Sequence, residues 1–216
     1  MKYKGIIFDL DGVICSTDEY HYQAWKALAE RLGIPFDRER NNLLRGVSRM
    51  ASLDIILEKS EKRYSDAEKA AFAEEKNALY RRLLGSMTPH DLSDGVKATL
   101  NALRETGVRM AIGSSSKNTP FILERIGLSG FFDAVADGSC ITRSKPDPEV
   151  FLKAADMLGL APADCLVVED AHAGVQAAVS GGFSCAAMGD ARDDERADFH
   201  LTRFGDLMTV GAEYGG

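Results

Sequence analysis

Two acidic residues, Asp9 and Asp11, lie two positions apart near the start of the chain, directly after the apolar run Gly5-Ile6-Ile7-Phe8. The apolar run predicts a buried strand that ends where the acids begin. Carboxylates in such a place are costly unless a cation or a reaction uses them. An ionised Asp9 could attack phosphorus as a nucleophile, and Asp11 could act as general acid and base. A simple Asp-Gly turn would explain Asp11 but not Asp9.

Two further groups are suited to holding a phosphoryl group. Ser114 follows the apolar stretch 108–113, and its hydroxyl and the neighbouring backbone N–H groups could bind a phosphoryl oxygen. Lys145 lies in the constrained segment Ser144-Lys145-Pro146-Asp147-Pro148, where it could neutralise phosphate as a point charge. Taken singly, an ordinary serine-rich loop and a solvated surface lysine would explain both residues.

A second acidic pair, Glu169 and Asp170, follows the apolar stretch 165–168. Together with Asp9 it would supply hard oxygen ligands of the kind that Mg²⁺ prefers. For Asp170 alone, an acid that caps the following helix is an equally good explanation. That alternative does not account for both acids and the Asp9–Asp11 pair together.

The chemistry-bearing residues follow strands that alternate with helices. Apolar periodicity predicts strands over 5–8, 108–113, 134–136, 165–168, 184–188 and 199–202, and helices over 18–32, 50–59, 66–84, 118–126, 148–158 and 172–180. This order predicts an α/β fold with a doubly wound parallel sheet. Residues 16–87 contain helices only, which predicts an all-α cap inserted after the first strand into a Rossmann-like core of 1–15 and 88–216. Ligands of such sheets bind beyond the carboxyl ends of the strands, where the acids, Ser114 and Lys145 should converge.

Composition narrows the class of partner. The chain has 216 residues, 45% of them apolar, and a net charge of −7, which argues against nucleic acid or an anionic membrane as a partner. The four cysteines are widely spaced and form no CxxC motif, so we expect reduced thiols in a cytoplasmic protein and no zinc site. No apolar segment is long enough to span a bilayer. The acidic run 190–198 is predicted to be a solvated loop.

The combined order of these motifs, DxDG, a strand ending in Ser, Lys-Pro and then Glu-Asp, resembles the haloacid dehalogenase superfamily of phosphotransferases over nearly the whole chain. The resemblance implies a phosphoaspartyl enzyme with Asp9 as nucleophile and Asp11 as acid and base. It also implies a phosphoryl site and a Mg²⁺ site. The phosphoryl group would be held by Ser114, Ser115 and Lys145, and Mg²⁺ by Asp9, the main-chain carbonyl of Asp11, and Asp170, with Glu169 in a supporting role.

Residues 17–30 and 44–53 resemble the cap of phosphosugar mutases in this superfamily. The resemblance implies that Arg49 binds the distal phosphate of a sugar phosphate, and that Thr17, His21 and Lys76 couple cap closure to the position of Asp11. The implied substrate-binding residues are Gly46, Val47, Ser48, Ser52, Trp25 and Lys76 in the cap and Ser116, Lys117 and Asn118 in the core. The bland alternatives are a solvated Arg49 and a helix face shared by His21 and Trp25, which we prefer for Trp25.

Three functional hypotheses follow. The first is a mutase that interconverts β-D-glucose 1-phosphate and glucose 6-phosphate through β-glucose 1,6-bisphosphate, with these sugar phosphates as its partners and a monomeric chain. The second is a sugar-phosphate phosphatase of the same fold that uses water as the acceptor. The third, a non-catalytic module, is disfavoured because every expected catalytic group is present. Only the cap sequence separates the first two hypotheses, and it favours the mutase.

Overall fold

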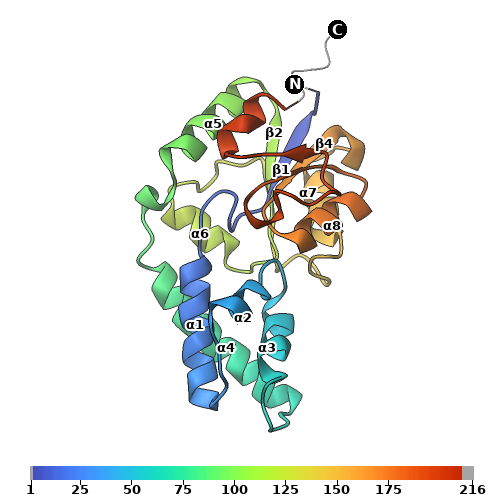
Figure 1. The fold of residues 1–216 in the computed structure, drawn as a ribbon. Coiled ribbons are helices and arrows are strands. Elements are labelled where there is room, and N and C mark those ends of the chain that lie inside the picture. Colours follow the sequence, from blue (N-terminus) through green and yellow to red (C-terminus); the bar gives the residue numbers. More distant parts are fainter. Residues whose placement is uncertain (1, 211–216) are drawn as a thin grey trace.

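The computed structural model describes residues 2–210, in which six strands form one parallel sheet in the order β3-β2-β1-β4-β5-β6 (Figure 1). The strands are β1 Gly5–Phe8, β2 Arg109–Gly113, β3 Ala134–Ala136, β4 Cys165–Glu169, β5 Ser184–Ala187 and β6 Phe199–His200. The chain first winds from β1 through β2 to β3, and then continues on the other side of β1 with β4, β5 and β6. The strand order therefore reverses beside β1, and the predicted doubly wound sheet is confirmed.

The helices divide into two groups. Between β1 and β2, α1 Asp18–Leu32, α2 Arg38–Asn42, α3 Arg49–Leu57 and α4 Asp66–Leu84 lie apart from the sheet (Figure 1). The others belong to the sheet layers: α5 Asp94–Glu105, α6 Thr119–Arg125, α7 Glu149–Leu158, α8 His172–Ser180, and the 3-10 turns η1 Pro89–Asp91, η2 Pro162–Asp164, η3 Gly189–Ala191 and η4 Phe204–Met208. The first group is the helical insertion expected after strand one, and its limits at residues 16 and 87 stay a prediction.

Two helices of the structure, α2 and α5, were not predicted from the apolar periodicity. No helix was expected between the cap and the strand that begins at residue 108, where Ser93-Asp94-Gly95 has the composition of a turn. In the structure Ser93 is instead the N-cap of α5, and its Oγ accepts a hydrogen bond from the backbone N–H of Val96. The short helix α2 was also missed, and it is capped in the same way by Asp37. The last predicted strand, 199–202, is shorter than expected, since β6 contains only Phe199 and His200.

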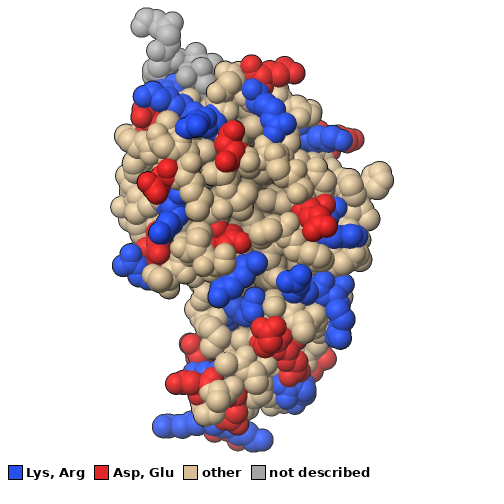
Figure 2. Space-filling view, turned by 180° about the vertical axis from the view of Figure 1, so that it is seen from behind, with Lys and Arg blue, Asp and Glu red and all other residues tan. Residues whose placement is uncertain are grey.

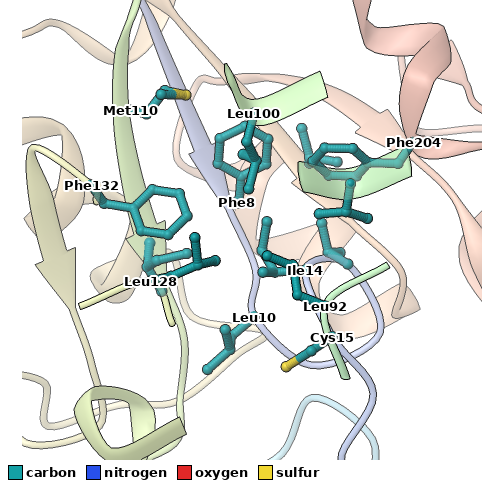
Figure 3. Packing of buried hydrophobic residues seen from close by; sticks show 14 of the residues in the cluster. Phe8, Leu10, Ile14, Cys15, Leu92, Leu100, Met110, Leu128, Phe132 and Phe204 are labelled. Atoms are coloured by element: carbon teal, nitrogen blue, oxygen red, sulfur yellow. The ribbon is translucent and has the colours of Figure 1, made fainter. Parts of the chain in front are cut away.

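Each face of the sheet buries its own apolar cluster, because alternate side chains of a strand point to opposite faces. On one face Phe8 of β1 packs beneath α5 and η4, with ring centroids 5.7 Å from Phe204 and 6.1 Å from Phe132 (Figure 3). On the other face Ile7 packs with Phe151 of α7 and its neighbours. Because both faces of β1 are buried, its carboxyl end is a rigid support for the residues that follow it.

The acidic run 190–198 departs from the expectation of a solvated loop. Asp193 is exposed as expected, but Asp194 is 7% exposed and accepts hydrogen bonds from His172 and Arg196. These charged hydrogen bonds, led by that from Arg196, lower the pKa of the Asp194 carboxyl. The expectation was therefore wrong for Asp194, whose hydrogen bond with His172 connects this loop to the start of α8.

The helices of the insertion have a core of their own. Trp25 of α1 is 2% exposed and lies in a cluster with Leu28, Leu53 and Ile56. This burial agrees with our preferred interpretation of Trp25 as a core residue. The same side chain nevertheless also contributes to the lining of the large cavity described below.

Replacing Trp25 with alanine should destabilise the protein by about 3–5 kcal/mol, because the change deletes a large buried side chain and leaves a cavity. The loss would be measured by denaturant unfolding. Leu43→Ala is the control, because Leu43 is 62% exposed and should have little effect. Equal unfolding midpoints for the two variants would contradict the placement of Trp25 in a core.

Candidate active site

The carboxyl ends of β1, β2 and β4 meet at one large cavity of about 860 Å³ between the sheet and the helical insertion. Asp9 directly follows β1, Ser114 follows β2, and Asp170 follows β4. Backbone hydrogen bonds fix the first two, since Asp9 N donates to Val168 O at 2.9 Å and Ser114 N donates to Ala136 O at 3.0 Å. The structure thus brings together side chains that lie more than a hundred residues apart in the chain, as the sequence predicted.

Lys145 is buried among the acids of the site. Its Nζ donates to Asp9 Oδ1 at 2.5 Å and also to Glu169 Oε1. Burial lowers the pKa of this amine, but the adjacent Asp9 and Glu169 carboxylates outweigh that effect and hold the pKa above its ordinary value. Lys145 is therefore a fixed positive charge beside Asp9 and not a solvated surface lysine.

The site holds more carboxyl groups than Lys145 could neutralise if all of them were ionised, and the pKa values of several are therefore raised. Burial, opposed by Lys145, raises the pKa of Asp9 to about 7. Burial, with Glu169, Asp9 and Asp11 nearby, raises the pKa of Asp170 to about 9. Asp170 also lies against the turn after Asp9, because a Cβ at Gly12 would be 2.0 Å from Asp170 Oδ2. A bound cation would stabilise the ionised form of carboxyl groups that are crowded in this way.

The donor set fits Mg²⁺. Within residues 2–210 no three or more His, Cys, Asp or Glu residues are arranged to hold a metal ion. The predicted set needs only the Asp9 and Asp170 carboxylates and the Asp11 carbonyl, all hard oxygen donors of the kind Mg²⁺ takes together with water. Glu169 is engaged elsewhere, because its Oε2 accepts from the backbone N–H of Asp170 at 2.8 Å and of Ala171 at 2.9 Å. Its role as a support for the site, like the metal set itself, stays a prediction.

Asp11 is held by the first residue of the insertion. Thr17 donates to it twice, from the backbone N to Oδ1 and from Oγ1 to Oδ2, each at 2.6 Å. Burial raises the pKa of the Asp11 carboxyl and outweighs the hydrogen bonds from Thr17, which lower it. The raised pKa favours the protonated carboxyl, which a general acid requires. Tyr80 donates in turn to Thr17 Oγ1 at 2.9 Å. Sequence reasoning missed Tyr80, although its position four residues after Lys76 on a predicted helix was a usable signal.

His21 and Lys76 lie beside this group. Lys76 Nζ is 2.9 Å from His21 Nδ1, and His21 Nε2 is 3.9 Å from Asp11 Oδ2. Burial first, and then the nearby cations, lower the pKa of both His21 and Lys76. The structure therefore connects the insertion to Asp11 through Thr17 and His21, with Lys76 beside His21. The resemblance implied that these three residues couple cap closure to Asp11, and that coupling stays a prediction.

The predicted substrate-binding residues line the same cavity from two sides. From the insertion come Trp25, Gly46, Val47, Ser48, Arg49, Ser52 and Lys76, and from the core Ser114, Ser115, Ser116, Lys117, Asn118 and Lys145. Ser115 Oγ is buried and, within the described chain, has no hydrogen-bond partner, so it is available to a ligand. Asn118 is already engaged by the insertion, because its Nδ2 donates to Asn77 Oδ1 at 3.0 Å. Their contacts with substrate stay predictions.

Arg49 lines the cavity from the insertion and can receive an anion there. Its side chain is 26% exposed, and its one ion pair, with Glu74, is long at 3.6 Å. Burial lowers its pKa, with Glu74 acting in the opposite direction. A half-buried guanidinium with so loose a partner retains donors for a phosphate. The alternative of a fully solvated Arg49 does not agree with this placement.

A parallel sheet with an aspartate pair, a buried lysine and a second acidic pair at its carboxyl edge is the arrangement of a phosphoryl-transfer fold. The family model for haloacid dehalogenase-like hydrolases matches residues 3–182, and the chain belongs to this family. Within residues 2–210 no helix is long and apolar enough to cross a membrane.

The relatives include both mutases and phosphatases. The chain is 42% identical over 206 residues to the beta-phosphoglucomutase of Bacillus subtilis, covering 94% of this chain and 91% of the relative. It is 34% identical over 183 residues to the fructose-1-phosphate phosphatase YqaB of Escherichia coli, covering 84% and 94%. The crystal structure of beta-phosphoglucomutase from Clostridium difficile matches with a TM-score of 0.90 at 38% identity, covering 95% and 93%.

Proposed function

We propose that this chain is a β-phosphoglucomutase, which interconverts β-D-glucose 1-phosphate and glucose 6-phosphate through an aspartyl phosphate and β-glucose 1,6-bisphosphate. One observation carries the proposal. A single cavity is lined by cationic groups from both of its sides, Lys145 beside Asp9 in the core and Arg49 in the cap. A bisphosphate needs a cationic group for each phosphate, whereas a monophosphate needs only one. The 42% identity to a protein of this name supports the same assignment.

The proposed reaction divides between two aspartates. Asp9 carries the phosphoryl group at the start of the cycle. Asp11 takes the proton from the free hydroxyl of β-glucose 1-phosphate, whose oxygen attacks the aspartyl phosphate, and the bond between phosphorus and Asp9 breaks to give β-glucose 1,6-bisphosphate. After the bisphosphate has turned, the Asp9 carboxylate attacks the other phosphorus, the bond between that phosphorus and the sugar oxygen breaks, and Asp11 gives its proton to that oxygen. Thr17 keeps Asp11 in place for both proton transfers, since it holds both carboxylate oxygens.

Lys145 and the serine loop hold the phosphoryl group between the two steps. Lys145 balances charge on Asp9, and the Ser114 and Ser115 hydroxyls bind the remaining phosphoryl oxygens. Mg²⁺, when bound by Asp9, Asp170 and the Asp11 carbonyl, reduces the repulsion between the nucleophile and the phosphoryl oxygens. The cap would exclude water from the aspartyl phosphate and would hold the bisphosphate while it turns to present its other phosphate to Asp9.

A coupled assay tests this proposal. The protein is incubated with Mg²⁺, β-glucose 1-phosphate and a catalytic amount of glucose 1,6-bisphosphate, and glucose 6-phosphate is followed with its dehydrogenase while free phosphate is measured in parallel. Rapid glucose 6-phosphate with little free phosphate is the expected result. Release of phosphate as the main product would instead favour the sugar-phosphate phosphatase, the alternative that the YqaB relative supports. The proposal includes sugar phosphates as the ligands, a monomeric chain and a cytoplasmic location.

Replacing Arg49 with alanine should weaken kcat/KM by about 2–4 kcal/mol, because a charged hydrogen bond and the orientation it provides are both lost. The same coupled assay measures the effect. Arg63→Ala is the matched control, since Arg63 is an exposed arginine of the insertion outside the cavity. Turnover of the Arg49 variant at the level of the control would remove Arg49 from the site.

A further inference from the structure

The loop between α2 and α3 carries an arginine that the proposed reaction does not use. Arg45 pairs through one guanidinium nitrogen with Asp18, at the start of α1, and through another with Asp190 in η3 of the core. Asp18 and Arg45 both belong to the insertion, whereas Asp190 follows the sheet strand β5. Arg45 therefore joins two elements of the cap to the core, through residues up to 145 positions apart in the chain.

The segment beside Arg45 also contacts the core through close packing. Gly46 has φ +74°, and a Cβ there would lie 3.4 Å from the Cβ of Ala171 and 3.5 Å from that of Ala173. These small side chains at the start of α8 allow the cap loop to approach the core backbone. In Figure 1 the connection between α2 and α3 is the part of the cap that reaches up to the core below α8.

The polar contacts between the cap and the core indicate the role of the Arg45–Asp190 pair. Among the described residues, Arg45–Asp190 is the ion pair between permanently charged side chains that joins the cap to the core. The other polar contacts between the two parts include Thr17 and His21 with Asp11, and Asn77 with Asn118. Figure 2 shows mainly Lys and Arg side chains at the narrow junction of cap and core, with acidic side chains on either side of it.

We propose that Arg45 and Asp190 form a cap latch, an ion pair that favours the closed arrangement in which the cap loop lies against the core. The two residues thereby act as a positioning pair for sugar-phosphate binding. This inference rests on the proposed function, because binding at both ends of a bisphosphate requires Arg49 of the cap to face Lys145 of the core. If only the closed form grips both phosphates, the apparent affinity falls in proportion to the closed fraction. The latch therefore affects KM more than kcat, since saturating substrate itself closes the cap.

The test uses Asp190→Asn, because Asp190 does not line the cavity. A partly exposed ion pair has a modest strength, so we expect KM for β-glucose 1-phosphate to rise about two- to fivefold with kcat nearly unchanged. The ligand-free variant should also have a larger radius of gyration in small-angle X-ray scattering. Asp193→Asn is the matched control from the same loop, because Asp193 pairs only with its neighbour Arg192 and should change neither quantity.

Two further measurements make the test specific to the pair. Arg45→Gln should enlarge the radius of gyration of the wild-type protein but not that of the Asp190→Asn variant, because the partner is already lost. Salt should enlarge the wild-type protein toward the variant, since exposed pairs are screened. The latch is overturned if the Asp190 and Asp193 variants scatter alike, or if the Asp190 variant opens with KM unaltered. An inactive wild-type protein would instead refute the proposed function, and scattering would still decide the latch.

Discussion

Asp9→Asn should abolish conversion of β-glucose 1-phosphate, with a loss of at least about 10⁴-fold in kcat, the scale seen when a nucleophile that acts as part of a catalytic unit is removed. The amide keeps the size of the side chain but cannot form the aspartyl phosphate. Lys145 would retain its contact with Glu169, so the surroundings should survive. Activity is measured with the coupled assay, and phosphorylation of the protein by intact-mass spectrometry after incubation with glucose 1,6-bisphosphate. A phosphorylated Asp9→Asn protein would show that another residue is the nucleophile.

Stability provides an independent control for the same variant. In the unfolded chain the pKa of Asp9 is near 3.8, and burial raises it to about 7 in the folded metal-free protein. The unfolded chain therefore releases the Asp9 proton at a lower pH than the folded protein does. The contribution of Asp9 to the free energy of unfolding falls as the pH rises between these two values. Asp9→Asn should remove that part of the decline. The check is the melting temperature at pH 5 and pH 8 without Mg²⁺, where an equally steep decline in the variant would contradict a buried Asp9 with a raised pKa.

Asp170→Asn is the second change with a large expected effect, a loss of about 10³-fold in kcat/KM, because several kcal/mol of charge stabilisation by the metal would be lost. Binding offers a readout that does not depend on turnover. A ligand at about 100 times its Kd stabilises a protein by about 2.7 kcal/mol, so Mg²⁺ should raise the melting temperature of the wild-type protein but not of this variant. Asp164→Asn, which changes a partly exposed acid of the core that pairs with Lys4, is the control and should keep the Mg²⁺ response.

The pH dependence of Mg²⁺ binding follows from the same carboxylate. Burial and the neighbouring acids raise the pKa of Asp170 to about 9 in the metal-free protein, so protons compete with the ion at neutral pH. The affinity for Mg²⁺ should therefore increase from pH 6 to pH 9, as measured by calorimetry in buffers matched for ionic strength. Binding of Mg²⁺ that is independent of pH, or equal in Asp170→Asn, would remove Asp170 from the ligand set.

The lysine and the serine loop show how far the sequence predicts the site. Ser114, like Asp9 and Asp170, is found from its position directly after an apolar strand, and parallel strands bring such positions to one edge. Lys145 follows no strand, so its burial between Asp9 and Glu169 was visible only in the structure. The helix α5 was missed because a serine that caps a helix and a serine in a turn have the same local composition.

The sequence by itself determined the order of the strands and of the longer helices apart from α5, the acids at the strand ends and the presence of a helical insertion, because each of these depends on periodicity and on neighbouring residues. Only the tertiary structure decided which side chains of the insertion meet the core. Tyr80 reaches Thr17 across 63 positions, and Arg45 reaches Asp190 across 145. Such contacts depend on how two separately folded groups of helices and strands are placed against each other, and no local pattern in the chain records that placement.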